Sequence, residues 1–110
     1  MLGISLENQI GIVTGAGSPY GIGRSMVLAL VKAGAKCIYA CDLNLGNMES
    51  LEAEAKSINS ASQIRGTLLD VSSESATIDL LRKIIQSHGR MDFFFANAGY
   101  AYYRYGTCLP

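Results

Sequence analysis

Residues 10–24 read IGIVTGAGSPYGIGR, and this stretch decides the fold of the chain. It begins with a short apolar run at positions 10–13 and leads into an apolar-periodic run at positions 25–31. Glycines are concentrated between the two runs, where they let the backbone turn sharply and leave space that a Cβ atom would occupy. The stretch therefore predicts a buried strand, a glycine turn and a helix, in that order.

A glycine turn between a strand and a helix is the local structure that binds the pyrophosphate of a dinucleotide. Backbone N–H groups at the start of the helix face the anion, and the helix dipole favours it by roughly 0.3–1 kcal/mol. A plain turn with structural glycines is the alternative. A P-loop does not fit, because no pair of glycines has the required spacing and Arg24 stands where the phosphate-binding lysine would be.

The composition argues against several other classes of protein. The chain has 110 residues, enough for one domain, and a formal net charge of zero with no basic block for nucleic acid or an anionic membrane. No apolar run approaches the ~20 residues that span a bilayer, and no export signal is visible. The cysteines at positions 37, 41 and 108 lack a metal-binding spacing. We therefore expect no metal site, and free thiols in a reducing, cytoplasmic setting.

Strand and helix patterns alternate along the chain at the spacing of βαβ units. Short apolar stretches predict strands at 10–13, 37–40 and 91–96, and the alternating order of elements places another strand at 65–69. Helical spacing predicts helices at 21–33, at 45–58 and from Ser72 or Ser73 to His88. The side chains expected on the inner faces of these helices are Met26, Val27, Leu30, Val31, Met48, Leu51, Ala55, Ile58, Ile78, Leu81, Ile84 and Ile85.

Right-handed crossovers arrange these elements into one topology. The prediction is an α/β fold, a Rossmann-type doubly wound parallel sheet with strand order 3-2-1-4, truncated after the fourth strand. Its first two helices cover one face and the third covers the other. Residues 1–99 form this dinucleotide-binding half-domain, and residues 100–110 form an irregular aromatic tail.

Polar residues follow each strand, and all four strand ends meet at one edge of a parallel sheet. Asp42, nineteen residues after Gly23, has a carboxylate that can accept hydrogen bonds from both adenosine ribose hydroxyls and would repel a 2′-phosphate. Asp42 therefore favours NAD over NADP. A basic residue that could favour NADP, Arg24, directly follows the glycine turn. Asp70-Val71 follows the third strand, and Asn97 follows the fourth. Each also has a structural interpretation: a solvated strand-end carboxylate or helix cap for Asp42, an N-cap for Asp70, and a turn residue for Asn97.

In their order, the four elements resemble the short-chain dehydrogenase/reductase family, whose N-terminal half carries TGxxxGxG, an acid after strand two, a DV pair after strand three and an NAG turn after strand four. The resemblance covers residues 5 to 99. It implies that the pyrophosphate is lined by Gly15, Gly21, Ile22 and Gly23. It further implies that Asp42, with the adjacent Leu43, takes the ribose, that Asp70 and Val71 frame the adenine, and that Asn97, Ala98 and Gly99 face the cofactor.

The glycine loop departs from the family pattern, because two extra residues precede Gly21. Counting from Gly17 would restore the spacing, but Ala16 would then replace the threonine. We prefer an insertion, in which Ser18-Pro19-Tyr20 bulges outward over the phosphates and Ser18 donates a hydrogen bond to one of them. In this interpretation Ser18 and Tyr20 join the candidate cofactor site.

In the resembled family, a serine and a tyrosine-x-x-x-lysine pair exchange the proton while hydride moves to or from the nicotinamide. These residues lie after the fourth strand, and the sequence ends at Pro110 before they could appear. We therefore assign no catalytic residue. Tyr100 and Arg104 imitate the pair in the wrong place, and His88 is interpreted as a helix-end residue.

Two function classes follow. The chain is the cofactor-binding part of an NAD- or NADP-dependent oxidoreductase, taking a small-molecule substrate only if the rest of the fold is supplied. Alternatively, it is a non-catalytic nucleotide-binding or regulatory product that pairs with a full-length partner. A methyltransferase that uses the acid after strand two would leave the NAG turn unexplained.

The phenylalanines at 93–95 would form an apolar edge strand, which predicts self-association.

Overall fold

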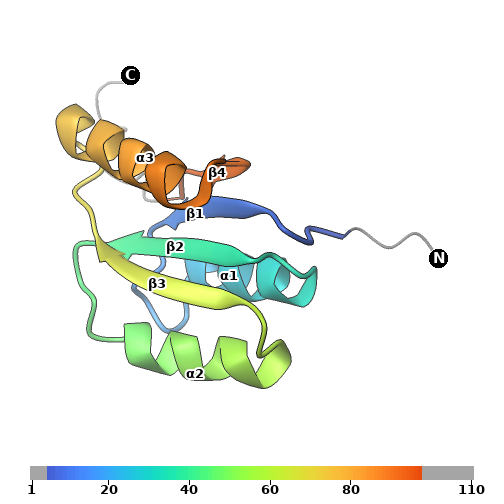
Figure 1. Ribbon diagram of the computed structural model, residues 1–110. Helices are drawn as coiled ribbons and strands as arrows, with labels where there is room; N and C mark the ends of the chain where they lie inside the picture. Colours follow the sequence, from blue (N-terminus) through green and yellow to red (C-terminus); the bar gives the residue numbers. More distant parts are fainter. Residues whose placement is uncertain (1–4, 98–110) are drawn as a thin grey trace.

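The computed structural model describes residues 5–97, which form a four-stranded parallel sheet with helices on both faces (Figure 1). The elements in chain order are β1 (Ile10–Thr14), α1 (Ile22–Lys32), β2 (Cys37–Asp42), α2 (Met48–Ile58), β3 (Gln63–Leu68), α3 (Glu74–His88) and β4 (Phe93–Phe95). The strand order β3-β2-β1-β4 confirms the predicted topology.

The central strands are buried on both faces, which explains their continuous apolar sequences. Along β2, Ile38 and Ala40 pack toward α1 and α2. Cys37, Tyr39 and Cys41, which alternate with them, pack toward α3. Alternation of side chains along a strand produces these two cores. The doubly wound arrangement is therefore confirmed, with α1 and α2 on one side of the sheet and α3 on the other (Figure 1).

The first two helices bury narrower stripes than the sequence predicts. Val27 and Val31 of α1 are fully buried, as are Leu51 and Ala55 of α2, but Ile58 is 43% exposed. Met26 and Leu30 are only half-buried. Ile58 lies at the last position of its helix.

Helix α2 begins three residues later than predicted, at Met48 instead of Leu45. The backbone N–H of Gly46 donates to the side-chain oxygen Oδ1 of Asn44 at 2.8 Å. This local bond stabilises a turn in place of a first helical turn, as asparagine side chains commonly do. The shift places Asn47 at the N-terminal boundary of the helix.

The ends of α3 match the sequence signals, but its inner face matches only in part: Ile84 is buried and Leu81 packs against the core, as predicted. Ser73 caps the helix by accepting a hydrogen bond from the Ala76 N–H at 3.2 Å, and Gly89 ends it with a φ of 75°. The prediction placed Ile78 and Ile85 inside, yet they are 40% and 52% exposed, and the buried residues of α3 are Leu80 and Ile84. A single helix that packs on a sheet buries only the stripe of its own side chains that faces the sheet. Within residues 5–97, α3 has no helical neighbour on that face.

The outer strands also differ from their predicted bounds. β3 begins at Gln63 because it pairs with β2 along six residues, although its edge position leaves most of its side chains exposed. β4 is shorter than predicted and spans Phe93–Phe95. Just before it, the Asp92 N–H donates to the Ile10 carbonyl oxygen at 2.7 Å and the Asp92 carboxylate accepts the Ile10 N–H at 2.8 Å. Gly11 of β1 provides the space for Phe93, since a Cβ on Gly11 would lie 2.1 Å from the phenyl ring.

Among the described residues, no helix is long and apolar enough to cross a membrane.

Candidate functional site

The carboxyl ends of all four strands lie at one edge of the sheet, as predicted. Thr14 of β1 pairs with Cys41, Asp42 of β2 pairs with Leu68, and Val13 pairs with Phe95. The segments that follow each strand therefore start side by side. Parallel α/β sheets bind their ligands at this edge, next to the point where the chain reverses its strand order.

The glycine turn packs the start of α1 directly against the end of β1. Gly15 follows β1 with a φ of 71°, a left-handed conformation that favours glycine. A Cβ on Gly23 would lie 2.2 Å from the Gly15 carbonyl oxygen, so only glycine fits at position 23. Gly15 and Gly23 are thus the contacting pair of the motif, in agreement with the insertion interpretation of the loop.

The N-terminus of α1 has the features of an anion site. No side chain caps it, because its N-cap residue is Gly21, and its first turn contains no acidic residue. The first N–H groups of a helix have no partner within the helix and carry the positive end of its dipole. Ile22, at the first helical position, is 70% exposed. This arrangement can accept a phosphate oxygen without a competing carboxylate.

The inserted residues form a compact exposed turn. The Gly21 N–H donates to the Ser18 carbonyl oxygen at 3.4 Å, and the Tyr20 N–H donates to Ser18 Oγ at 3.3 Å. The Tyr20 side chain is 97% exposed, and Ser18 and Pro19 are exposed as well. The segment bulges outward as predicted, whereas a hydrogen bond from Ser18 to phosphate stays a prediction.

Asp42 ends β2 with its half-buried carboxylate turned toward the glycine loop. Its Oδ2 accepts the Gly17 N–H at 2.8 Å, and its Oδ1 accepts the Asn44 N–H at 3.1 Å. The alternative in which Asp42 caps a helix is wrong, because α2 begins at Met48 with Asn47 at its N-cap. Leu43, the next residue, is 59% exposed.

Sequence reasoning missed two residues of this site, Gly17 and Asn47. Gly17 was considered only for its spacing, but it is buried and bonded to Asp42. The predicted helix 45–58 includes Asn47, yet the Asn47 Nδ2 donates to the Gly17 carbonyl oxygen at 2.9 Å. A turn signal was present at Asn44 and Gly46, and it would have moved the start of the helix to the correct place.

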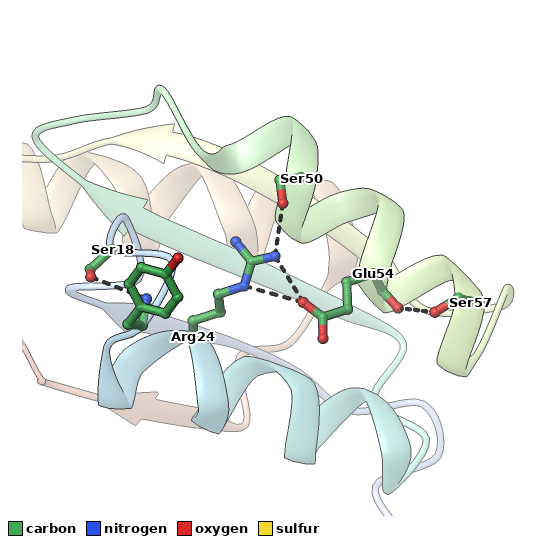
Figure 2. Close-up of polar contacts among 6 residues, drawn as sticks. Ser18, Arg24, Ser50, Glu54 and Ser57 are labelled. Carbon is green, nitrogen blue, oxygen red and sulfur yellow. Dashed lines mark hydrogen bonds and ion pairs between the residues drawn. The ribbon is translucent and has the colours of Figure 1, made fainter.

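Arg24 is turned away from the glycine loop and toward α2 (Figure 2). Its Nη2 lies 2.8 Å from Glu54 Oε1 and donates to Ser50 Oγ at 2.9 Å, and its Nε also donates to Glu54. Its Nη1 is buried and has no acceptor among residues 5–97. The ion pair joins α1 to α2, which places most of this guanidinium in helix packing.

Asp70 and Val71 lie at the same edge, after β3. Asp70 Oδ1 accepts hydrogen bonds from the Ser72 N–H at 2.9 Å and the Ser72 hydroxyl at 2.6 Å. These bonds hold the pKa of the exposed Asp70 carboxyl below its ordinary value. The N-cap alternative is wrong, because Ser73 caps α3. Val71 is 39% exposed and is open to a ligand at this edge.

Asn97 lies directly beside the glycine pair. Its backbone N–H donates to Thr14 Oγ1 at 2.9 Å, and the Thr14 hydroxyl donates to the Phe95 carbonyl at 3.4 Å. Its side-chain nitrogen would be 3.0 Å from a Cβ on Gly23. The structure therefore brings Asn97 together with Gly15 and Gly23. Ala98, Gly99 and the tail 100–110 lie outside the described residues.

The two buried cysteines and His88 have structural contacts. Burial, with a contribution from the Asp42 charge, raises the pKa of the Cys41 thiol to about 12, and burial raises the pKa of Cys37 as well. Neither forms a thiolate near neutral pH. His88 Nε2 lies 2.9 Å from the Tyr39 hydroxyl oxygen, so this histidine joins the end of α3 to the sheet.

Comparisons with known proteins agree with this geometry. A family model described as short chain dehydrogenase matches residues 9–107. Chanoclavine-I dehydrogenase easD of Arthroderma benhamiae is 36% identical over 85 residues, which are 77% of this chain and 34% of that protein. Dehydrogenase/reductase SDR family member 11 of Homo sapiens is 33% identical over 95 residues, which are 86% of this chain and 35% of that protein.

Solved structures share the fold. The structure of NAD+-bound xylitol dehydrogenase matches with a TM-score of 0.72 and 33% identity, covering 86% of this chain and 35% of that one. A metagenomic short-chain oxidoreductase in complex with NADP matches with a TM-score of 0.70 at 24% identity, covering 81% of this chain and 38% of that one. The chain spans about a third of the length of the proteins it matches. With its family match, strand order and glycine pair, the chain belongs to the short-chain dehydrogenase family, oxidoreductases whose Rossmann fold binds NAD or NADP.

Proposed function

We propose that this chain binds NAD at the carboxyl edge of its sheet, as the cofactor-binding part of an oxidoreductase. The reaction would transfer hydride between the nicotinamide and an alcohol or carbonyl substrate. The observation that carries the proposal is the close contact of Gly23 with Gly15 beneath an uncapped helix N-terminus, with the Asp42 carboxylate fixed next to the same loop. It supplies donors for the pyrophosphate and an acceptor for the ribose in one place.

The proposed contacts follow the chain around this edge. Backbone donors at the start of α1 take the pyrophosphate, the carboxylate after β2 takes the adenosine ribose, the residues after β3 frame the adenine, and those after β4 face the rest of the cofactor. In chain order they are Gly15, Ser18, Tyr20, Gly21, Ile22, Gly23, Asp42, Leu43, Asp70, Val71, Asn97, Ala98 and Gly99.

NAD is the proposed cofactor because a carboxylate, not a cation, ends β2, where we propose that the ribose binds. Arg24 is the basic residue that would favour NADP, and two of its three guanidinium nitrogens are bonded to α2. NADP is the alternative cofactor, since Arg24 Nη1 has no acceptor within residues 5–97. A 2′-phosphate there would also face the negative charge of Asp42.

We propose no catalytic step by these residues alone. The nicotinamide supplies the hydride chemistry when it is bound. Residues 96–110, which follow the fourth strand, contain neither a serine nor a tyrosine-x-x-x-lysine pair. We therefore propose binding without turnover for this chain. The second candidate is a regulatory product that pairs with a full-length relative. For either candidate we propose a reducing, cytoplasmic location, where thiols such as those of Cys37 and Cys41 stay free.

Titration of the purified chain with NADH, followed by its fluorescence, tests the proposal. We expect saturable binding, with a blue shift and enhancement of the nicotinamide emission, and no hydride transfer to added ketones or from added alcohols. Saturable binding supports the dinucleotide site. Absence of binding at millimolar NADH by a chain with cooperative unfolding would refute it, and turnover would refute the assignment of the chain as non-catalytic.

We also propose that the chain self-associates through β4. Phe94 and Phe95 are each 38% exposed, on opposite faces of a strand that pairs only with β1 among the described residues. An apolar edge strand with open hydrogen-bonding groups is a site for pairing between chains. Sedimentation velocity should show a dimer or larger species that Phe95→Lys reduces. Ile58→Lys, a change of similar exposure on α2, should leave the distribution unchanged. A monomeric wild-type chain would contradict the proposal.

A further inference from the structure

The carboxylate of Asp42 is fixed in place before any ligand arrives. One oxygen accepts the Gly17 N–H at 2.8 Å and the other accepts the Asn44 N–H at 3.1 Å. An ionised carboxylate accepts about four hydrogen bonds, so each oxygen keeps a lone pair for another donor. Asp42 is therefore held in one orientation while it can still accept from a pair of hydroxyl groups.

Asn47 supports this arrangement from the other side of the loop. It occupies the N-cap of α2, where an asparagine side chain ordinarily accepts a hydrogen bond from the first turn of its own helix. Here no such cap is formed, and Nδ2 donates to the Gly17 carbonyl oxygen at 2.9 Å. Both polar groups of the Gly17 backbone are thus bonded, its N–H to Asp42 and its carbonyl to Asn47.

Gly17 also fits its place only because it lacks a side chain. A Cβ there would lie 2.6 Å from Asp42 Cγ, 2.7 Å from Oδ2 and 2.6 Å from the Asn44 carbonyl oxygen. The φ of Gly17 is not positive, so space and not backbone conformation makes glycine necessary. Any larger residue must displace either the loop or the carboxylate.

We propose that Asn47 and Gly17 are positioning residues that determine cofactor specificity through Asp42. Asn47 fixes the Gly17 peptide, and that peptide fixes the carboxylate where it accepts from the ribose hydroxyls and repels a 2′-phosphate. This inference rests on the proposed function. It differs from a structural role for Asn47, because loosening the peptide weakens NAD binding while it relieves the repulsion of NADP.

Asn47→Ser tests the inference, because serine caps a helix well but is too short to reach the Gly17 carbonyl. NADH and NADPH are titrated separately into the full chain, and the ratio of the NADPH to the NADH dissociation constant is compared. We expect this ratio to fall by about tenfold in the variant, the scale of one lost hydrogen bond. Asn59→Ser is the matched control: Asn59 Nδ2 donates to the Val31 carbonyl at 3.3 Å, at the opposite end of α2. Its ratio should stay that of the wild type.

A second measurement needs no nucleotide. Hydrogen exchange of the Gly17 amide should be slow in the wild type and in Asn59→Ser, and at least about fivefold faster in Asn47→Ser because the peptide is released. An unchanged binding ratio or unchanged exchange in Asn47→Ser, in a chain that discriminates NADH from NADPH, overturns the inference and leaves the proposed function standing. A wild-type chain that binds both cofactors equally also overturns it. A folded chain that binds neither refutes the proposed function itself.

Discussion

Gly23→Ala should destabilise the chain by about 2–3 kcal/mol and abolish dinucleotide binding. The added Cβ would lie 2.2 Å from the Gly15 carbonyl oxygen and 2.8 Å from its carbonyl carbon, both of which are backbone atoms that cannot rotate away. The start of α1 must therefore move off the end of β1. The loss is expected although alanine is the better helix former by about 1 kcal/mol, so the sign of the effect separates packing from helix propensity. Chemical denaturation and NADH titration measure the two parts.

Gly21→Ala is the matched control, two residues away in the same motif. A Cβ there would approach Ser18 Cβ at 3.2 Å, and Ser18 is an exposed residue that can shift by a few tenths of an ångström. We expect a cost of about 1 kcal/mol or less, chiefly from alanine at an N-cap. Equal destabilisation by the two substitutions would mean that the tight contact between helix and strand does not hold the turn.

The strand order could be predicted because it depends on properties that a sequence contains. Continuous apolar runs such as residues 37–40 indicate strands buried on both faces, and right-handed crossovers then leave one arrangement of the sheet. The strand-end positions of Asp42 and Asn97 follow from the same reasoning, since parallel strands end at a common edge. Both the topology and the location of the candidate site could therefore be predicted from the sequence.

The errors arose where a residue's environment depends on neighbours distant in sequence. Ile85 of α3 has the helical spacing of a core residue but is 52% exposed, because the sheet beneath the helix covers only the stripe around Ile84. At the start of β4, the Asp92 carboxylate accepts the Ile10 N–H, a contact between residues 82 positions apart. Periodicity reports the pattern of a segment and not the width of the surface that covers it.

The roles of the individual glycines between β1 and α1 could not be predicted from the sequence either. Spacing identified these glycines, but their separate roles depend on atoms that each one faces: Gly23 faces the Gly15 backbone, whereas Gly17 faces the Asp42 carboxylate. The link from Asn47 to Gly17 spans 30 positions and joins a helix start to a loop. No motif encodes it, so it becomes visible only when β2 places the two segments together.

Asp42→Ala should reduce the preference for NAD over NADP by roughly ten- to a hundredfold. The wild-type carboxylate can accept from two ribose hydroxyls, and hydrogen bonds to a charged group contribute about 1.5–3 kcal/mol. The same charge repels a 2′-phosphate, so its removal weakens NAD binding and strengthens NADP binding together. Dissociation constants for NADH and NADPH, each measured by fluorescence titration, give the ratio directly.

Asp70→Ala controls for a general loss of negative charge at this edge of the sheet. Asp70 is an exposed carboxylate bonded to Ser72 after β3, so its removal should change the affinity for both cofactors to a similar extent and leave their ratio unchanged. If Asp42→Ala also leaves the ratio unchanged, Asp42 is not at the ribose, and its two backbone hydrogen bonds serve only to hold the loop. If the ratio falls in Asp42→Ala and in Asn47→Ser but not in Asp70→Ala, one carboxylate and the peptide that positions it determine which dinucleotide the chain accepts.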